Sequence, residues 1–222
     1  MNLWKNLLKN FLMNGGVKNN MAEVKILING YAKKINDNEY ASCSVTLIRD
    51  NNLNILVDTG MDRKLLLEAI KKENLKTDDI NFVVLTHTHI DHCILAGIFE
   101  NAQIVDNGAV YSFDGKITEH DGKIPGTEIK IISTPGHDQF HCTVLVDTNQ
   151  YGKVAIAADV FWWPDGAEQK TDYESLINLE DEYMKDKAVL KESRKKVLEI
   201  ADYIIPGHGK PFRVMPRKRL TL

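Results

Sequence analysis

The feature that most constrains this chain is the run Thr86-His-Thr-His-Ile-Asp-His92, which directly follows the apolar segment 80–85. Residues two apart in an extended segment point the same way, so His87 and His89 can hold one metal ion. The chain must then turn, which directs Asp91 and His92 toward a second ion. Imidazole and carboxylate groups suit Zn²⁺, and also iron or manganese. Asp91 alone could cap a following helix, but its histidine neighbours favour a metal site.

Three further candidate ligands are scattered along the chain, each at the end of a predicted strand. His137 and His208 both follow a Pro-Gly pair, which is typical of a tight turn. Asp159 follows the apolar segment 154–158, and a carboxylate at that place can bridge two cations. A single histidine or strand-end aspartate is usually structural, so the order of these residues carries the hypothesis.

That order resembles the metallo-β-lactamase superfamily from about residue 23 to the end of the chain. Val57-Asp-Thr-Gly60 resembles the superfamily's first motif, whose aspartate, here Asp58, orients the metal ligands. The resemblance implies two divalent cations, most simply Zn²⁺. The first would be held by His87, His89 and His137, and the second by Asp91, His92 and His208, with Asp159 bridging both.

The expected secondary structure agrees with the fold that this resemblance implies. Strands are predicted over 24–31, 42–49, 53–58, 80–85, 102–105, 109–113, 128–133, 143–146, 153–158 and 203–205, and helices over 63–73, with Asp62 as its N-cap, and 173–201. Two sheets between outer helices would bury these strands. We therefore expect an α/β (α+β) fold, the four-layer αββα sandwich of the metallo-β-lactamases.

The chain divides into an N-terminal arm, 1–20, and one domain, 21–222. Apolar residues recur in the arm at helical spacing (Leu3, Leu7, Leu8 and Phe11), and Gly15-Gly16 would end such a helix. Lys5 and Lys9 interrupt the apolar stretch, which argues against a signal peptide. The arm would pack on the domain, or Met21 would be the true start; binding to a membrane surface or a homodimer contact are the alternatives.

Composition restricts the partners. The net charge of −3 gives no global basic field for nucleic acid, so DNA is not expected, although a local patch could serve RNA. The three cysteines show no Cys-x-x-Cys spacing and are odd in number, which favours a reducing, cytoplasmic location. No apolar run approaches the length of a transmembrane segment.

A narrower resemblance is to the metallo-β-lactamase domain-containing protein 1 family. It rests on the segments 30–31, 41–48, 158–161, 192–197 and 206–214. Animal members are associated with endonucleolytic cleavage of histone pre-mRNA, so the resemblance implies an endoribonuclease acting on RNA phosphodiesters. The alternatives are a hydrolase of small esters, thioesters, lactones or β-lactams, and a non-catalytic metal-binding module. The complete ligand set argues against the last.

For either substrate, two cations about 3.5–4 Å apart would share a water, lower its pKa to about 7 and generate a bridging hydroxide. Asp91 would accept its proton. We expect Phe161, Trp162 and Trp163 to line the substrate cleft, with Tyr31 and the segment 33–40 on the opposite rim. His141, four residues beyond His137, would touch the ligands or relay protons.

Overall fold

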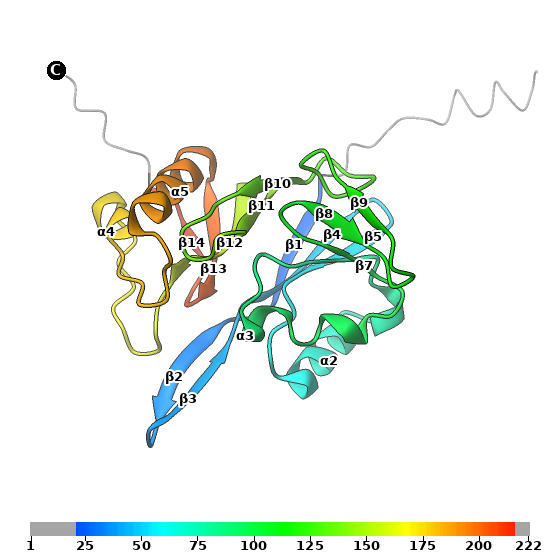
Figure 1. Ribbon diagram of the computed structural model, residues 1–222, viewed down its shortest axis with the longest axis horizontal. Coiled ribbons are helices and arrows are strands. Elements are labelled where there is room, and N and C mark those ends of the chain that lie inside the picture. Colours follow the sequence, from blue (N-terminus) through cyan, green and yellow to red (C-terminus); the bar gives the residue numbers. More distant parts are fainter. Residues whose placement is uncertain (1–20, 216–222) are drawn as a thin grey trace, which may run out of the picture.

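The computed structural model describes residues 21–215, so the expected arm lies outside the described residues. Two β-sheets face each other, with helix α2 outside one sheet and helices α4 and α5 outside the other (Figure 1). This arrangement confirms the expected α/β fold with its αββα layers. No helix among residues 21–215 is long and apolar enough to cross a membrane.

The first sheet has seven strands and the second has five. In spatial order, the first sheet contains β1 (Glu23–Ile28), β4 (Val45–Asp50), β5 (Leu53–Val57), β6 (Phe82–Val84), β7 (Gln103–Val105), β8 (Ala109–Tyr111) and β9 (Ile117–Glu119). The second contains β10 (Lys130–Ser133), β11 (Cys142–Thr148), β12 (Gly152–Trp162), β13 (Tyr203–His208) and β14 (Phe212–Arg213). Neighbouring strands are antiparallel, except that β5, β6 and β7 run parallel, as do β12 and β13.

Apolar side chains fill the three interfaces between the four layers. Between the sheets, Val57 and Val84 meet Val144 and Ile156 in one buried cluster. The outer face of the first sheet packs on α2 (Arg63–Lys72), and that of the second on α4 (Tyr173–Ile177) and α5 (Lys187–Ile200). Burial of each such aliphatic side chain contributes about 1.5–3 kcal/mol, which makes these layers the main source of stability.

The predicted cap of α2 is confirmed. The Asp62 carboxylate accepts a hydrogen bond from the backbone N–H of Leu65 at 2.9 Å. This bond satisfies one of the donors that the first turn of a helix leaves unpaired. The remaining short helical segments are η1 (Thr77–Asp79), α3 (Ile90–Cys93) and η2 (Ala96–Ile98).

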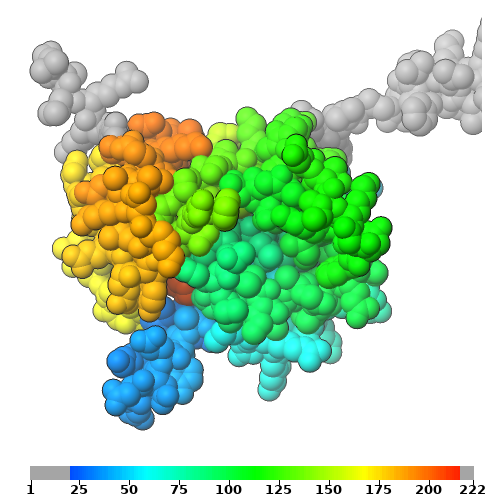
Figure 2. Space-filling model, viewed as in Figure 1, coloured from blue at the N-terminus to red at the C-terminus, as the bar shows by residue number. Residues whose placement is uncertain are grey.

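The segment 33–40, which lay between two expected strands, belongs to a β-hairpin. Strands β2 (Tyr31–Ile35) and β3 (Asn38–Ser42) pair with each other as a separate two-stranded sheet. Asn36 and Asp37 make the turn with φ angles of 47° and 63°. Asparagine and aspartate tolerate this left-handed conformation better than most residues. The hairpin projects from the body of the domain (Figures 1 and 2).

The prediction of one helix over 173–201 was wrong, because residues 178–186 separate α4 from α5. The Asp186 carboxylate caps α5 by accepting hydrogen bonds from the N–H groups of Ala188 and Val189. Arg194 of α5 anchors the connecting loop, and this residue is only 2 % exposed. Its guanidinium donates to the carbonyls of Leu179 and Val160. Residues 178–186 contain no glycine or proline, and side-chain hydrogen bonds stabilise the break between the two helices. The break could therefore not be predicted from local sequence signals.

Candidate metal centre

Seven histidine and aspartate side chains meet where several strands of the two sheets end. Four of them, His87, His89, Asp91 and His92, follow β6 or lie in α3, His137 follows β10, and His208 ends β13. Asp159 lies within β12, which continues beyond its expected end to Trp162. The structure therefore brings together all seven residues that the sequence motifs indicated.

The first group joins His87, His89, His137 and Asp159. The Nε2 atoms of His87 and His137 lie 3.0 and 3.1 Å from Nδ1 of His89. Asp159 Oδ2 lies 3.3 Å from Nε2 of His137. Ligands about 2.0–2.1 Å from a tetrahedral Zn²⁺ are separated from one another by about 3.4 Å. The four atoms thus have the spacing of a cation's ligands.

The second group joins Asp91, His92 and His208, and the other oxygen of Asp159 faces it. His208 Nε2 lies 3.3 Å from Asp91 Oδ2 and 3.7 Å from Asp159 Oδ1. Within residues 21–215, Asp91 Oδ2, His92 Nε2 and Asp159 Oδ1 are buried without a hydrogen-bond partner. Buried polar atoms rarely remain unpaired. A cation here would satisfy all three atoms, so the donor set fits a divalent metal.

The backbone around Asp159 is shaped to bring this carboxylate between the two groups. Ala158 has a φ of 43°, and the pairing of β12 with β13 shifts register there. A non-glycine residue at positive φ is strained and tends to mark functional sites. On β13, a Cβ atom at Gly207 would lie 1.7 Å from Asp159 Oδ1. Only glycine leaves room for the carboxylate at that position.

Asp58, for which the resemblance implied an orienting role, contacts one ligand of the second group. Its carboxylate accepts hydrogen bonds from the N–H and hydroxyl of Thr86 at 2.9 and 2.8 Å. His92 Nδ1 lies 2.8 Å from the same carboxylate, which leaves Nε2 for a metal. Similarly, His208 Nδ1 lies 3.0 Å from the carbonyl oxygen of Tyr31. A partner on the far ring nitrogen fixes the tautomer and orientation of a metal-binding histidine.

Asp181 makes the equivalent contact with the far ring nitrogen of His137. The sequence motifs did not identify this residue. Its Oδ2 lies 2.7 Å from His137 Nδ1, and the residue is 3 % exposed. Asp181 belongs to the loop between α4 and α5, in a charged stretch that has the composition of a solvated helix face. No spacing or motif in that stretch distinguishes Asp181 from its exposed neighbour Glu180.

The electrostatics suit cation binding. Burial lowers the pKa values of His87 and His89, which keeps both rings neutral and able to ligate. Burial alone would raise the pKa of Asp159, but the neighbouring His92 and His208 lower it, so the carboxylate is ionised. Burial alone would lower the pKa of His92, but the side chain of Cys43 and the carboxylates of Asp159 and Asp58 raise it. A cation entering the second group would displace such protons.

His141 is buried beside the site without bonding to a ligand. Its Nδ1 lies 3.0 Å from Thr134 Oγ1, and its ring centroid is 4.9 Å from that of His87. Burial lowers its pKa to about 3, so the ring is neutral at physiological pH. The expected contact with ligands is therefore a packing contact, and its role in proton relay stays a prediction.

The expectation for the aromatic segment after Asp159 was wrong for two of its three residues. Phe161 and Trp163 are 0 % and 4 % exposed and pack in the core beneath α4 and α5. Trp162, on the opposite face of the strand, lines the cleft above the cluster of candidate metal ligands, with its ring centroid 6.2 Å from that of His208. Tyr31 contributes its carbonyl to His208, and its side chain does not line that cleft.

The cleft that opens onto the cluster has a volume of about 420 Å³. The hairpin β2–β3 forms one wall, and the loop between α4 and α5 forms the other. Apolar lining comes from Ala32, Tyr40, Ala41, Ile90, Trp162, Pro164 and Tyr183, and charged lining outside the cluster from Lys33, Lys34, Glu39 and Glu182.

Comparisons with known proteins agree with this geometry. The profile of the Metallo-beta-lactamase superfamily matches residues 40–121. Metallo-beta-lactamase domain-containing protein 1 of Xenopus laevis is 32% identical over 208 residues, covering 89% of this chain and 84% of that protein. A Thermotoga maritima structure assigned to the metallo-beta-lactamases has a TM-score of 0.67 at 20% identity, covering 87% of this chain and 99% of that one. A dizinc quorum-quenching lactonase has a TM-score of 0.58 at 17% identity, covering 77% and 73%.

Replacing Asp181 by asparagine should weaken metal binding by roughly 10- to 100-fold, because the charge that polarises His137 is lost. Glu180→Gln is the matched control, since Glu180 is exposed and next in sequence. Competition with a chelator of known affinity measures the effect. Equal metal affinity of the two variants would show that Asp181 does not support the site.

Replacing Gly207 by alanine should remove metal from the site while the fold persists, because the new Cβ displaces the Asp159 carboxylate. Gly97→Ala serves as the control, since no atom of the described residues lies within 4 Å of the Cβ it would add. Elemental analysis reports metal content and circular dichroism reports folding. A folded Gly207→Ala protein with full metal content would contradict the placement of Asp159.

Proposed function

Because the chain belongs to the metallo-beta-lactamase superfamily and is a metal-dependent hydrolase, we propose that its seven clustered residues hold two divalent cations, most simply Zn²⁺, and that it hydrolyses a small acyl compound such as an ester, thioester or lactone. The observation that carries the substrate class is the cleft above the cluster, which is mainly apolar and balanced in charge.

Bound divalent cations would supply Lewis acidity and an activated water. Asp91 is the carboxylate best placed to take a proton from that water. Both Asp91 and Asp159 line the cleft, but the side chain of Asp91 is 17% exposed and that of Asp159 only 7%. Although burial would raise the pKa of Asp91, His208 and His92 lower it, so the group is ionised and can accept a proton.

The rim of the cleft favours an acyl chain. Ile90, Tyr40 and Tyr183 are 60%, 46% and 48% exposed and would be covered by an apolar group of the substrate. Burial of apolar surface contributes about 25 cal/mol per Å². Lys33 and Lys34 are offset by Glu39 and Glu182, so no net positive field attracts a polyanion. The lactonase among the structural neighbours uses this fold for such chemistry.

RNA is the second candidate, supported by the resemblance to metallo-β-lactamase domain-containing protein 1. Lys33 and Lys34 could contact phosphates, and the exposed rings of Tyr40 and Tyr183 could stack on bases. Of the three aromatic residues that were expected to line the cleft, only Trp162 lies there, beside these two tyrosines.

Asp91→Asn should abolish turnover while at least one metal ion remains, because the three histidines of the first group are untouched. Glu182→Gln makes the same acid-to-amide change at the cleft without altering the cluster, and should retain activity. Steady-state kinetics with metal analysis separates loss of chemistry from loss of metal. Near-normal turnover of a metal-loaded Asp91→Asn protein would remove its proposed role.

The substrate class is tested by assaying the metal-loaded protein with chromogenic esters, thioesters, lactones and β-lactams beside single-stranded and structured RNA. We expect acyl turnover and no RNA cleavage, and Tyr40→Ala with Tyr183→Ala should raise KM for acyl substrates. The double variant Lys33→Ala, Lys34→Ala should leave turnover of a neutral ester unchanged.

RNA cleavage without acyl turnover would overturn the acyl proposal and favour RNA. In that case the lysine variants should weaken RNA binding and its salt dependence, and each lost tyrosine stack should cost about 1–3 kcal/mol.

A further inference from the structure

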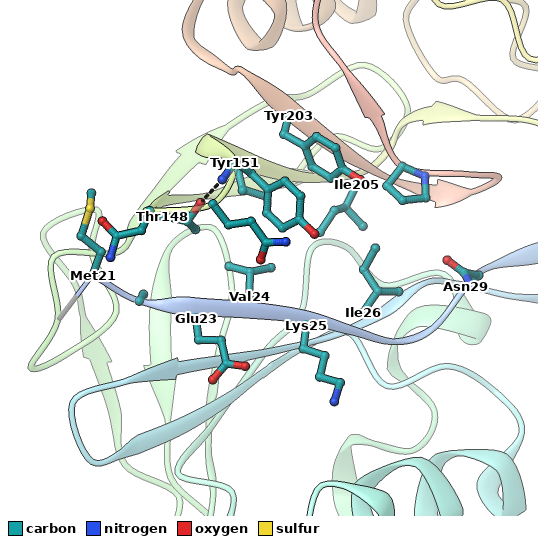
Figure 3. Close-up of a pocket in the computed structure, with 15 residues that line it drawn as sticks. Met21, Glu23, Val24, Lys25, Ile26, Asn29, Thr148, Tyr151, Tyr203 and Ile205 are labelled. Atoms are coloured by element: carbon teal, nitrogen blue, oxygen red, sulfur yellow. Dashed lines mark hydrogen bonds between the residues drawn. The ribbon is translucent and has the colours of Figure 1, made fainter.

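We propose that the N-terminal segment 3–12 of this chain packs as an amphipathic helix into a groove beside β1. The groove has a volume of about 690 Å³ and lies between the edge of the first sheet and the second sheet. Figure 3 shows Val24 and Ile26 of β1 facing Tyr151, Tyr203 and Ile205, while Glu23 and Lys25 point away. The groove is lined by a different set of residues from the catalytic cleft.

The groove is an opening in the hydrophobic core. Val24, Ile26, Tyr151 and Tyr203 pack against the central cluster between the sheets, yet each is only partly buried. The rings of Tyr151 and Tyr203 stack with centroids 4.6 Å apart, which forms a flat apolar wall. The Arg213 guanidinium lies over the Tyr203 ring at 6.0 Å from its centroid, but Val24, Ile26 and Tyr151 stay partly exposed within the described residues, so an apolar ligand here would complete the core.

β1 is also an edge strand. Within the described residues it pairs only with β4, and its other edge faces the groove. Unpaired backbone groups on an exposed edge promote association with other strands, and natural proteins often cover such an edge with a helix or loop. An apolar helix in the groove would protect both the edge and the partly buried core residues.

The arm is the occupant that the chain itself supplies. It joins the domain at Met21, which lines one end of the groove. Residues 13–20 contain Gly15-Gly16, so they can reverse the chain direction. Eight residues span up to about 26–29 Å when extended. A ten-residue helix is about 15 Å long, shorter than the roughly 20 Å of the six-residue β1. Reach and length therefore both allow the helix to lie along the strand.

The sequence of the arm provides the matching surface. Leu3, Leu7, Leu8 and Phe11 fall on one face of a helix, which would contact the tyrosines, Val24 and Ile26. Lys5 and Lys9 fall outside that face and would remain in solvent. The C-terminal segment 216–222 is mainly basic and polar, so it lacks an equivalent apolar face.

Hydrogen exchange on the full chain tests the proposal. In the wild type, amides of β1 and of residues 203–205 should exchange roughly tenfold more slowly than in the double variant Leu7→Asp, Leu8→Asp. The control double variant Lys5→Ala, Lys9→Ala should match the wild type. A chain starting at Met21 should reproduce the exchange of the aspartate variant, which removes any effect of the new charges. Equal exchange in wild type and aspartate variant would overturn the proposal.

Two further measurements distinguish other occupants. Light scattering during size-exclusion chromatography should give a monomer mass while the protection persists. A dimer mass, with protection lost on dilution, would assign the groove to a second copy and overturn docking within one chain. Vesicles of phosphatidylcholine and phosphatidylglycerol should leave the protection unchanged. If the arm bound vesicles, and the groove amides were unprotected when no vesicles were present, the proposal would also be overturned.

Discussion

The structure depends on one buried carboxylate placed among imidazole rings. Asp159 comes from the second sheet and stands between the two groups of candidate ligands, with one oxygen toward each. An isolated buried carboxylate is costly. Here the histidines keep it ionised, and one of its oxygens has no hydrogen-bond partner among the described residues. The positive φ of Ala158 and the missing side chain of Gly207 make sense as accommodations to that carboxylate.

The supporting residues of the site explain why the outer layers matter to its chemistry. His92 is oriented by Asp58 from the first sheet, and His137 by Asp181 from the loop between α4 and α5. That loop is anchored by Arg194, and it also carries Tyr183 on the rim of the cleft. A change in the loop that alters the rim can therefore also disturb a candidate metal ligand.

The sequence predicted the parts of the molecule that depend on local chemistry. The histidine run, the Pro-Gly turns before His137 and His208, and the Asp62 cap each follow from residue type and spacing. Asp181 could not be found in this way, because its role depends on a fold that brings it to a histidine 44 residues away. The prediction that the aromatic residues after Asp159 line the cleft failed for a similar reason. Strand β12 continues to Trp162, and alternation along it turns Phe161 into the core.

We propose that the seven clustered residues form one binuclear site bridged by Asp159. The most direct measurement is anomalous scattering at the zinc, iron and manganese edges from crystals of freshly purified protein, with elemental analysis of the same sample. Two peaks about 3.5–4 Å apart on either side of the Asp159 carboxylate, and two ions per chain, are expected. A single ion in the cluster, or ions bound elsewhere with the seven side chains diverging, would contradict it.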